Sequence, residues 1–294
     1  MRLWLECIPC MLSVRFREIE KLVEDTNRRL EIAKRVVEVL YNELCLGCLC
    51  APIIATKMFR VVKQMTGVDD PYREYKIRSI RIALQLYHEV LRRMLSIDDL
   101  RRRVLEVLKM IAIANAIDMG VEGYKPPEPD ELVAHAVRSE IYGDVDKAID
   151  LLMKARSVAV VMDNAGECVF DRLLPDVLKD KKFVAVVKGG AFQNDVTVKE
   201  IELAELHRSF HEVIDTGSDA ASLIVDEVRR DVLDALNRMD LIVSKGMANY
   251  EYLTEVLGTV IRRPIVFVLT AKCRPISVEL SVPQTKPVVK VWIP

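Results

Sequence analysis

SVAVVMDNAGE, residues 157–167, joins a short valine-rich apolar run to a polar turn. An apolar run of this length is typical of a buried strand, and an amphipathic stretch after the turn completes a strand–turn–helix unit. The same form recurs at residues 183–190 (FVAVVKGG), 211–217 (HEVIDTG), 240–246 (DLIVSKG) and 264–270 (PIVFVLT). Repeated units of this kind predict an α/β fold with a parallel sheet covered by helices on both faces.

The residues before this sheet have a different spacing of apolar side chains. From about residue 9 to residue 155, apolar residues recur at three- and four-residue steps, as in RRLEIAKRVVEVLYNEL at residues 28–44. This spacing is typical of amphipathic helices, and the glycine and proline breaks predict five to seven of them. We therefore expect an all-helical N-terminal domain over residues 1–155 and an α/β domain over residues 156–294.

The composition argues against several classes of protein. Of 294 residues, 51% are hydrophobic and 30% are charged, and the net charge of −1 gives no general attraction to nucleic acid or to membranes. No stretch reaches transmembrane length without charges, and the N-terminal MRLWLECIPC lacks the layout of a signal peptide. We therefore expect a cytoplasmic protein whose seven cysteines are reduced.

Polar residues follow the predicted strands where ligands bind in parallel sheets, at the carboxyl ends. Asp163 and Asn164 end the first strand, and Asp195 follows the second one after Lys188-Gly189-Gly190. Carboxylate and amide oxygens suit a hard divalent cation, although each of these residues could instead cap a helix. If the strand ends converge, two carboxylates and an amide meet at one point.

The later strand ends are suited to an anion. Lys245 and Gly246 precede a helix expected to begin near Asn249, which would direct free backbone N–H groups outward, and Lys272 ends the last strand. A metal beside a phosphate site is what transfer of a phosphoryl group to water requires. Neither a GxxxxGK[ST] loop nor a GxGxxG turn after the first strand is present.

Several short motifs, in this order, resemble the damage-control phosphatases, in particular the subfamily with CxxC, GMAN and KC motifs. Here these motifs are Cys7 to Cys10, residues 246–249, and Lys272 with Cys273. DPY (70–72), NAID (115–118), DNAGE (163–167) and KGG with ND (188–195) also look like family segments. The resemblance implies a helical part packed on a Rossmann-like sheet and a phosphatase that uses Mn²⁺, Ni²⁺, Co²⁺ or Mg²⁺ on small phosphorylated metabolites.

The resemblance also implies roles for single residues. Asp163, Asn164 and Asp195 match the metal ligands, and Asp163 and Lys272 are the candidate catalytic residues. The candidate substrate contacts are Glu167, Lys245, Gly246, Ala248, Asn249 and Lys272. Relatives outside the subfamily carry an acidic residue, Leu and Asn after the lysine–glycine pair, where this chain has Met247-Ala248-Asn249. Their preference for sugar phosphates is therefore not carried over.

Three further interpretations follow from the residues themselves. Cys7, Cys10, Cys45 and Cys48 could form a structural zinc site, or they could be small core residues. Asp118 could reach the cleft from the helical part. Two rivals to a phosphatase are an S-adenosylmethionine-dependent methyltransferase, which would also use strand ends, and a zinc-stabilised interaction module without enzymatic activity.

Overall fold

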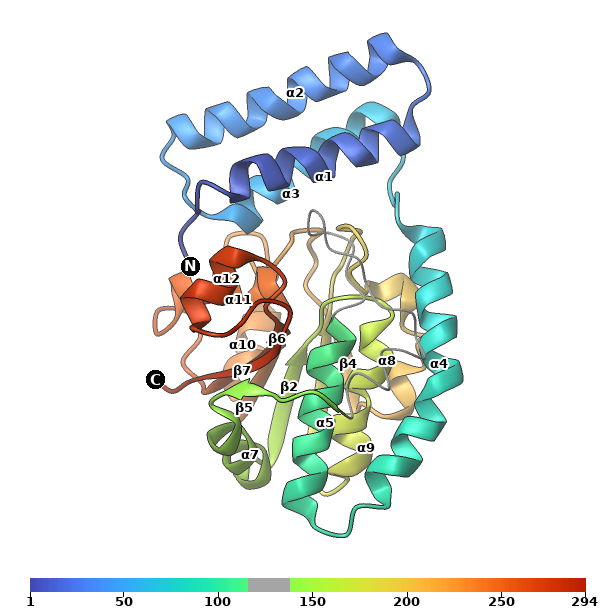
Figure 1. Ribbon diagram of the computed structural model, residues 1–294, viewed down its shortest axis with the longest axis vertical. Coiled ribbons are helices and arrows are strands. Elements are labelled where there is room, and N and C mark those ends of the chain that lie inside the picture. Colours follow the sequence, from blue (N-terminus) through green and yellow to red (C-terminus); the bar gives the residue numbers. More distant parts are fainter. Residues whose placement is uncertain (116–137) are drawn as a thin grey trace.

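The computed structural model describes residues 1–115 and 138–294. In Figure 1 three helices form a layer above one end of a larger part that contains the sheet: α1 (Cys7–Leu22), α2 (Thr26–Cys45) and α3 (Ala51–Thr66). Asp118, which we expected to reach the cleft, lies outside the described residues. None of the described helices combines the length and the apolar character needed to span a membrane.

Seven strands of the described residues form one sheet, in the order β1-β7-β6-β5-β2-β3-β4. The five predicted strands are confirmed: β2 (Ser157–Val161), β3 (Lys182–Val187), β4 (Glu212–Asp215), β5 (Leu241–Lys245) and β6 (Ile265–Thr270). These five are parallel, and the direction in which successive strands are added reverses between β2 and β5. A crevice at such a reversal is where ligands bind in α/β sheets.

Two strands were not predicted. β7 (Pro287–Trp292) pairs with β6 in the antiparallel direction, and the two-residue β1 (Tyr142–Gly143) pairs with β7. β7 follows a helix without the glycine-rich turn and second helix that marked the other units, so the repeated pattern did not extend to it. β1 is too short to leave a periodic signal.

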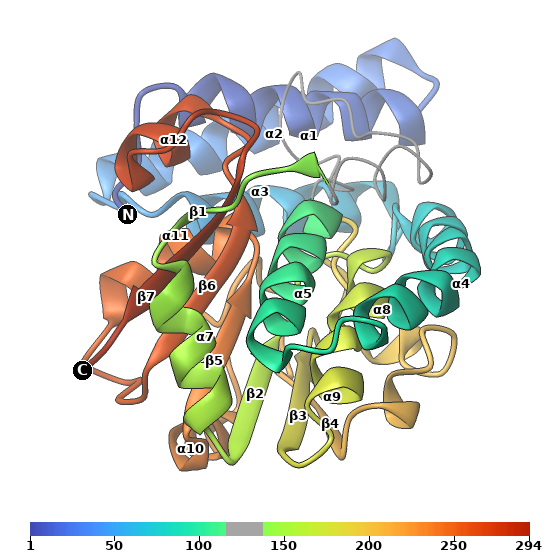
Figure 2. The same ribbon diagram turned by 60° about the horizontal axis from the view of Figure 1, so that its bottom comes forward.

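Helices cover both faces of the sheet, as predicted. On one face the core contains side chains of α4 (Arg73–Leu95), α5 (Leu100–Ala114), α7 (Val145–Lys154), α8 (Glu167–Asp171) and α9 (Leu173–Val177). On the other face it contains side chains of α10 (Arg230–Arg238), α11 (Met247–Val256) and α12 (Arg274–Leu280). Figure 2 shows α5 and α7 against the first of these faces. Because both faces are covered, every residue of β5 and β6 is buried.

The N-terminal residues divide differently from the expected domains. α1, α2 and α3 share a hydrophobic cluster of their own, whereas α5 and α7 pack on the sheet and α4 packs on α5, α8 and α9. The segment Met110 to Ala114 of α5 is buried throughout, because it lies against β6. The description of residues 1–155 as all-helical is also wrong at β1. The physical break in the packing therefore falls after α3, near residue 67, where Gly67 ends that helix in the left-handed conformation.

Candidate metal and phosphate site

The turns after β2 and β3 are joined by backbone hydrogen bonds. The N–H of Val196 donates to the Asp163 carbonyl at 2.8 Å, and the N–H of Ala165 donates to the Asn194 carbonyl at 2.9 Å. Asn164 and Asp195 thereby form an isolated antiparallel bridge. The predicted convergence of these two strand ends is present, since both Asp163 and Asp195 line one cavity of about 470 Å³.

The cavity lies between the carboxyl ends of the strands and the helical layer. Ala248 at the start of α11 and Lys272 after β6 line it together with the two aspartates. Among the motif cysteines, Cys7, Cys10 and Cys273 also line it. The motifs therefore meet at one cavity although they are spread over the whole chain.

Two amides orient the Asp163 carboxylate. Its Oδ2 accepts from Asn115 Nδ2 at 2.8 Å and from Asn164 Nδ2 at 3.2 Å. The Asn164 Oδ1 accepts from Asn194 Nδ2 at 2.8 Å and, as a carbonyl oxygen, has a second lone pair. Asn115 was not singled out from the sequence, where the only signal for it was its place in the NAID segment.

A buried cation accompanies the two aspartates. Lys188, the last residue before the paired glycines, has its Nζ 3.6 Å from Asp195 Oδ2. Burial lowers the pKa of Lys188, and the carboxylates of Asp195 and Asp163 partly offset this effect. A lysine ending a strand is usually a surface charge, so its burial could not be read from the sequence.

The donors at this point suit a hard divalent ion. Two carboxylates and an amide oxygen on adjacent turns match the preference of Mg²⁺ and Mn²⁺ for oxygen, with water completing the coordination. Within residues 1–115 and 138–294, no group of three or more His, Cys, Asp or Glu side chains is arranged to hold a metal. An ion at Asp163, Asn164 and Asp195 would thus depend on the amide oxygen and on water.

Glu167 and Lys245 lie behind the site. Both side chains are fully buried, and neither lines the cavity. The Lys245 ammonium contacts the carboxylates of Glu167 and Asp171, at 2.7 Å in the case of Asp171 Oδ1, and donates to the Ile111 carbonyl at 2.7 Å. These positions are behind the cavity wall, and the direct substrate contact expected of Glu167 and Lys245 stays a prediction.

This buried cluster holds the site from behind. Glu167 Oε2 accepts from Asn115 Nδ2 and from Asn164 Nδ2, both at 2.8 Å, so it orients the same amides that contact Asp163. Burial opposes the charged form of Lys245, but the carboxylates of Asp171 and Glu167 outweigh it and hold its pKa above the ordinary value. Burial also raises the pKa of Asp171 to about 7, although Lys245 lowers it.

The glycine of the GMAN motif allows close approach to Asp163. Gly246 has a φ of 78°, and a Cβ there would lie 1.9 Å from Asp163 Oδ2. α11 begins at Met247, two residues before the expected start at Asn249. Asn249 is buried, donates from Nδ2 to the Lys245 carbonyl at 2.9 Å and accepts from Ser222 Oγ at 2.9 Å. Ala248 therefore faces the cavity, whereas Asn249 ties α11 to its surroundings.

The cysteines do not gather into the zinc site that the spacing allowed. All seven lie in the described residues and none of them forms a disulfide, and Cys45 is exposed at the end of α2, away from the cavity lining. Burial raises the pKa of Cys7 to about 11 and that of Cys273 to about 12.

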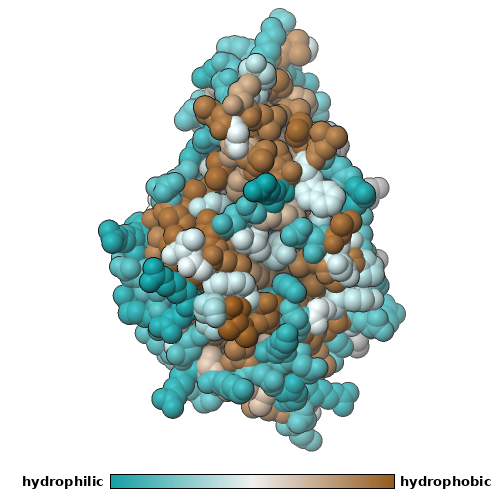
Figure 3. Space-filling model, turned by 90° about the vertical axis from the view of Figure 1, so that its left-hand side faces the viewer, coloured by the Kyte–Doolittle hydropathy of each residue, from teal (hydrophilic) through white to brown (hydrophobic). Residues whose placement is uncertain are grey.

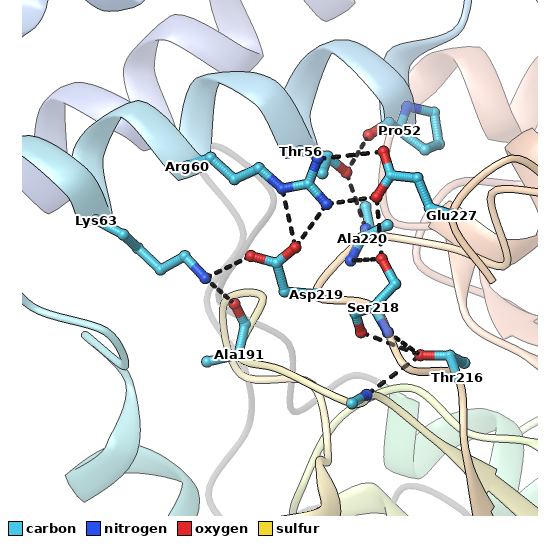
Figure 4. Close-up of polar contacts among 12 residues, drawn as sticks. Pro52, Thr56, Arg60, Lys63, Ala191, Thr216, Ser218, Asp219, Ala220 and Glu227 are labelled. Atoms are coloured by element: carbon cyan, nitrogen blue, oxygen red, sulfur yellow. Dashed lines mark hydrogen bonds and ion pairs between the residues drawn. The ribbon is translucent and has the colours of Figure 1, made fainter. Parts of the chain in front are cut away.

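Figure 4 shows how α3 holds the loop that carries Asp195. Arg60 of α3 contacts Asp219 at 2.6 Å and also contacts Glu227, and Lys63 contacts Asp219 Oδ2 at 2.6 Å. Lys63 also donates to the Ala191 carbonyl at 2.9 Å, four residues before Asp195. Asp219 is therefore the acceptor that joins the two layers.

The paired glycines make this arrangement possible. A Cβ at Gly189 would lie 2.8 Å from the Gly217 backbone, and one at Gly190 would lie 2.9 Å from Asp219 Cβ. The loop after β3 therefore packs directly on the loop after β4. Asp215, at the end of β4, contacts Arg229 at 3.1 Å.

Fold and site together define an α/β protein with two carboxylates and a lysine on the wall of one cavity at the ends of parallel strands. The family model of the damage-control phosphatase ARMT1-like domain matches residues 4–288. The chain therefore belongs to that family.

Similar proteins from archaea support the assignment. A damage-control phosphatase of Archaeoglobus fulgidus is 31% identical over 284 residues, which cover 94% of each chain. The damage-control phosphatase PH1575 of Pyrococcus horikoshii is 28% identical over 97% of this chain and 96% of its own. The crystal structure of a duf89 family protein (ph1575) from that organism has a TM-score of 0.84, 27% identity and 98% coverage of both chains.

Replacing Lys245 with Met should destabilise the fold strongly. The change leaves two buried carboxylates without their cation, a loss of about 3–5 kcal/mol in the free energy of unfolding. Denaturant titration measures this loss. Lys182→Met is the matched control, because the contact between Lys182 and Glu212 is half exposed and spans 3.9 Å. That control should change stability by less than about 1 kcal/mol, and equal effects of the two variants would contradict the prediction.

Replacing Asp219 with Asn should remove a pH-dependent part of the stability. Burial acts to raise the pKa of Asp219, but Arg60 and Lys63 outweigh it and hold that pKa below the ordinary value. A carboxyl with a lowered folded-state pKa stabilises the fold above its unfolded pKa, about 3.9, and loses this effect as the pH falls through the folded pKa.

The free energy of unfolding of wild type should therefore exceed that of Asp219→Asn by about 1–3 kcal/mol at pH 6. This difference should shrink below pH 4. Urea unfolding across this pH range measures it. Asp231→Asn, at an exposed aspartate that contacts Arg229 at 3.0 Å, is the control and should have little effect. A difference that stays constant down to pH 2 would refute the assignment.

Proposed function

We propose that this chain is a metal-dependent phosphatase that hydrolyses phosphate monoesters of small metabolites, with a role in removing damaged or surplus ones. The observation that carries the proposal is the presence of Asp163, Asp195 and Lys272 on the wall of one cavity. The names of the relatives from Archaeoglobus fulgidus and Pyrococcus horikoshii support both the reaction and the role.

A divalent ion such as Mn²⁺, Ni²⁺, Co²⁺ or Mg²⁺ would be held by Asp163, Asn164 and Asp195. When bound, it supplies positive charge that polarises a phosphoryl oxygen and lowers the pKa of a water molecule. Asn115 and Asn164 orient the Asp163 carboxylate through the hydrogen bonds to its Oδ2. Because this carboxylate is already held in place, it needs little reorganisation when the reaction begins.

The chain's own residues bind the substrate phosphate. The Lys272 ammonium neutralises charge on a phosphate oxygen, and it does so in a largely buried position, where charges interact strongly. The first N–H groups of α11, at Met247 and Ala248, have no partner within the helix and face an anion favourably. Gly246 keeps this helix start next to Asp163, because no larger residue fits there.

Neither rival reading has an observation in its favour. The free thiols do not assemble as the zinc-stabilised module requires. The relatives' names give no indication of a methyltransferase.

Replacing Asp163 with Ala should lower metal-stimulated hydrolysis of p-nitrophenyl phosphate by about 100-fold or more, because one carboxylate of the ion's site is lost. The assay uses protein stripped with a chelator and reloaded with each of the four ions. Asp215→Ala removes an aspartate from another strand end and should keep its activity. Circular dichroism verifies that both variants are folded. Unchanged turnover by folded Asp163→Ala would disprove the proposal.

A further inference from the structure

The cavity extends well beyond its phosphate end. From Asp163 and Lys272 it continues toward the helical layer, where α1 and α3 supply one wall and α11 supplies part of another. Apolar side chains line much of the cavity: Met11, Ala51, Pro52, Ala55, Phe192 and Met247. At about 470 Å³ the cavity is larger than a phosphate group needs and falls within the range of small-molecule sites.

The charges on the far part do not favour a second anion. Of the described lining residues, Lys272 and Arg274 carry positive charge, and Arg274 contacts the Glu6 carboxylate. Glu251, one helical turn after Ala248 on α11, adds a further carboxyl to the wall. A substrate carrying a second phosphate or a carboxylate at this end would meet like charge.

The apolar character continues outside the cavity mouth. Leu5, next to the lining residue Glu6, is 83% exposed, and Leu49, two residues before Ala51, is 49% exposed. Leu3 and Leu49 are joined by a backbone hydrogen bond of 2.7 Å, so the two segments lie side by side. Figure 3 shows apolar side chains gathered over the helical layer and along its boundary with the rest of the molecule.

We propose that the substrate is the phosphate monoester of an uncharged and largely apolar alcohol, whose carbon chain lies against α1 and α3. Glu251 disfavours esters that carry a second anionic group. This inference rests on the proposed phosphatase function and names the substrate class of the same site. The strand ends thus supply the chemistry, and the helical layer supplies the selectivity.

The first test is a series of linear alkyl phosphates, from methyl to octyl, with the metal-loaded full-length protein. Each methylene that enters an apolar wall should raise kcat/KM about 3- to 4-fold until the cavity is filled. The kcat/KM of hexyl phosphate should therefore exceed that of methyl phosphate by about 100-fold or more. Equal kcat/KM values along the series, or a preference for sugar phosphates over hexyl phosphate, would overturn the inference.

The second test compares hexyl phosphate with the same ester carrying a terminal carboxylate. Burial raises the pKa of Glu251 to about 7, so the assay is run at pH 8. For wild type, the kcat/KM of hexyl phosphate should be about 10-fold higher than that of the ester with the terminal carboxylate. Glu251→Gln should reduce that preference. Glu255→Gln changes a carboxylate on the same helix that does not line the cavity, and it should leave the preference unchanged. A preference unaffected by Glu251→Gln would remove Glu251 from the proposal.

Binding separates this inference from the proposed function. Hexylphosphonate and methylphosphonate cannot be hydrolysed, and calorimetry with the metal-loaded protein compares their affinities without turnover. Tighter binding of hexylphosphonate together with a lack of hydrolysis of every ester would sustain the apolar subsite and reject the phosphatase. Hydrolysis of p-nitrophenyl phosphate together with equal binding of both phosphonates would sustain the phosphatase and reject the apolar subsite.

Discussion

Two carboxylates held together at adjacent strand ends are the constraint on which the rest of this structure depends. Asp163 and Asp195 would repel each other if nothing compensated their charge. The backbone hydrogen bonds between the two turns fix their positions, and the buried ammonium of Lys188 lies 3.6 Å from Asp195. A divalent ion at this point would offset the remaining repulsion, which is the physical basis of the proposed metal site.

The surroundings show how that constraint is met. Behind the site, the fully buried contact of Lys245 with Glu167 and Asp171 is worth little as net stability, because desolvation offsets most of the attraction. The role of this contact is to hold side chains in position, because Glu167 fixes the amides of Asn115 and Asn164 against Asp163. Beside the site, Lys63 of α3 contacts both Asp219 and the Ala191 carbonyl in the loop that carries Asp195. Both aspartates are therefore held by groups that never face the cavity.

Sequence reasoning predicted the sheet because valine-rich runs such as residues 158–161 can be buried only with both faces covered. It placed Asp163 and Asp195 together because the ends of parallel strands meet at one edge. It could not separate residues that face the cavity from residues that support them, since both are polar and follow the same strands. For this reason the sequence did not show that Glu167 and Lys245 lie behind the cavity wall. The break after α3 was missed because the helices on either side of it have the same apolar periodicity.

The strand ends and the helices α1 and α3 have different roles in the proposed site, and this difference has a physical basis. Strand ends are rigid, because each backbone is fixed by neighbours on both sides, and rigid supports keep charged groups where reacting atoms need them. α1 and α3 are joined to the strand-end loops mainly by side-chain contacts such as those of Arg60 and Lys63 with Asp219. Changes in the residues of α1 and α3 that line the cavity therefore alter its shape without moving Asp163 or Asp195. On the proposed function, α1 and α3 would select the alcohol part of the substrate while the residues at the strand ends stay the same, so differences in substrate among relatives should be sought in these helices first.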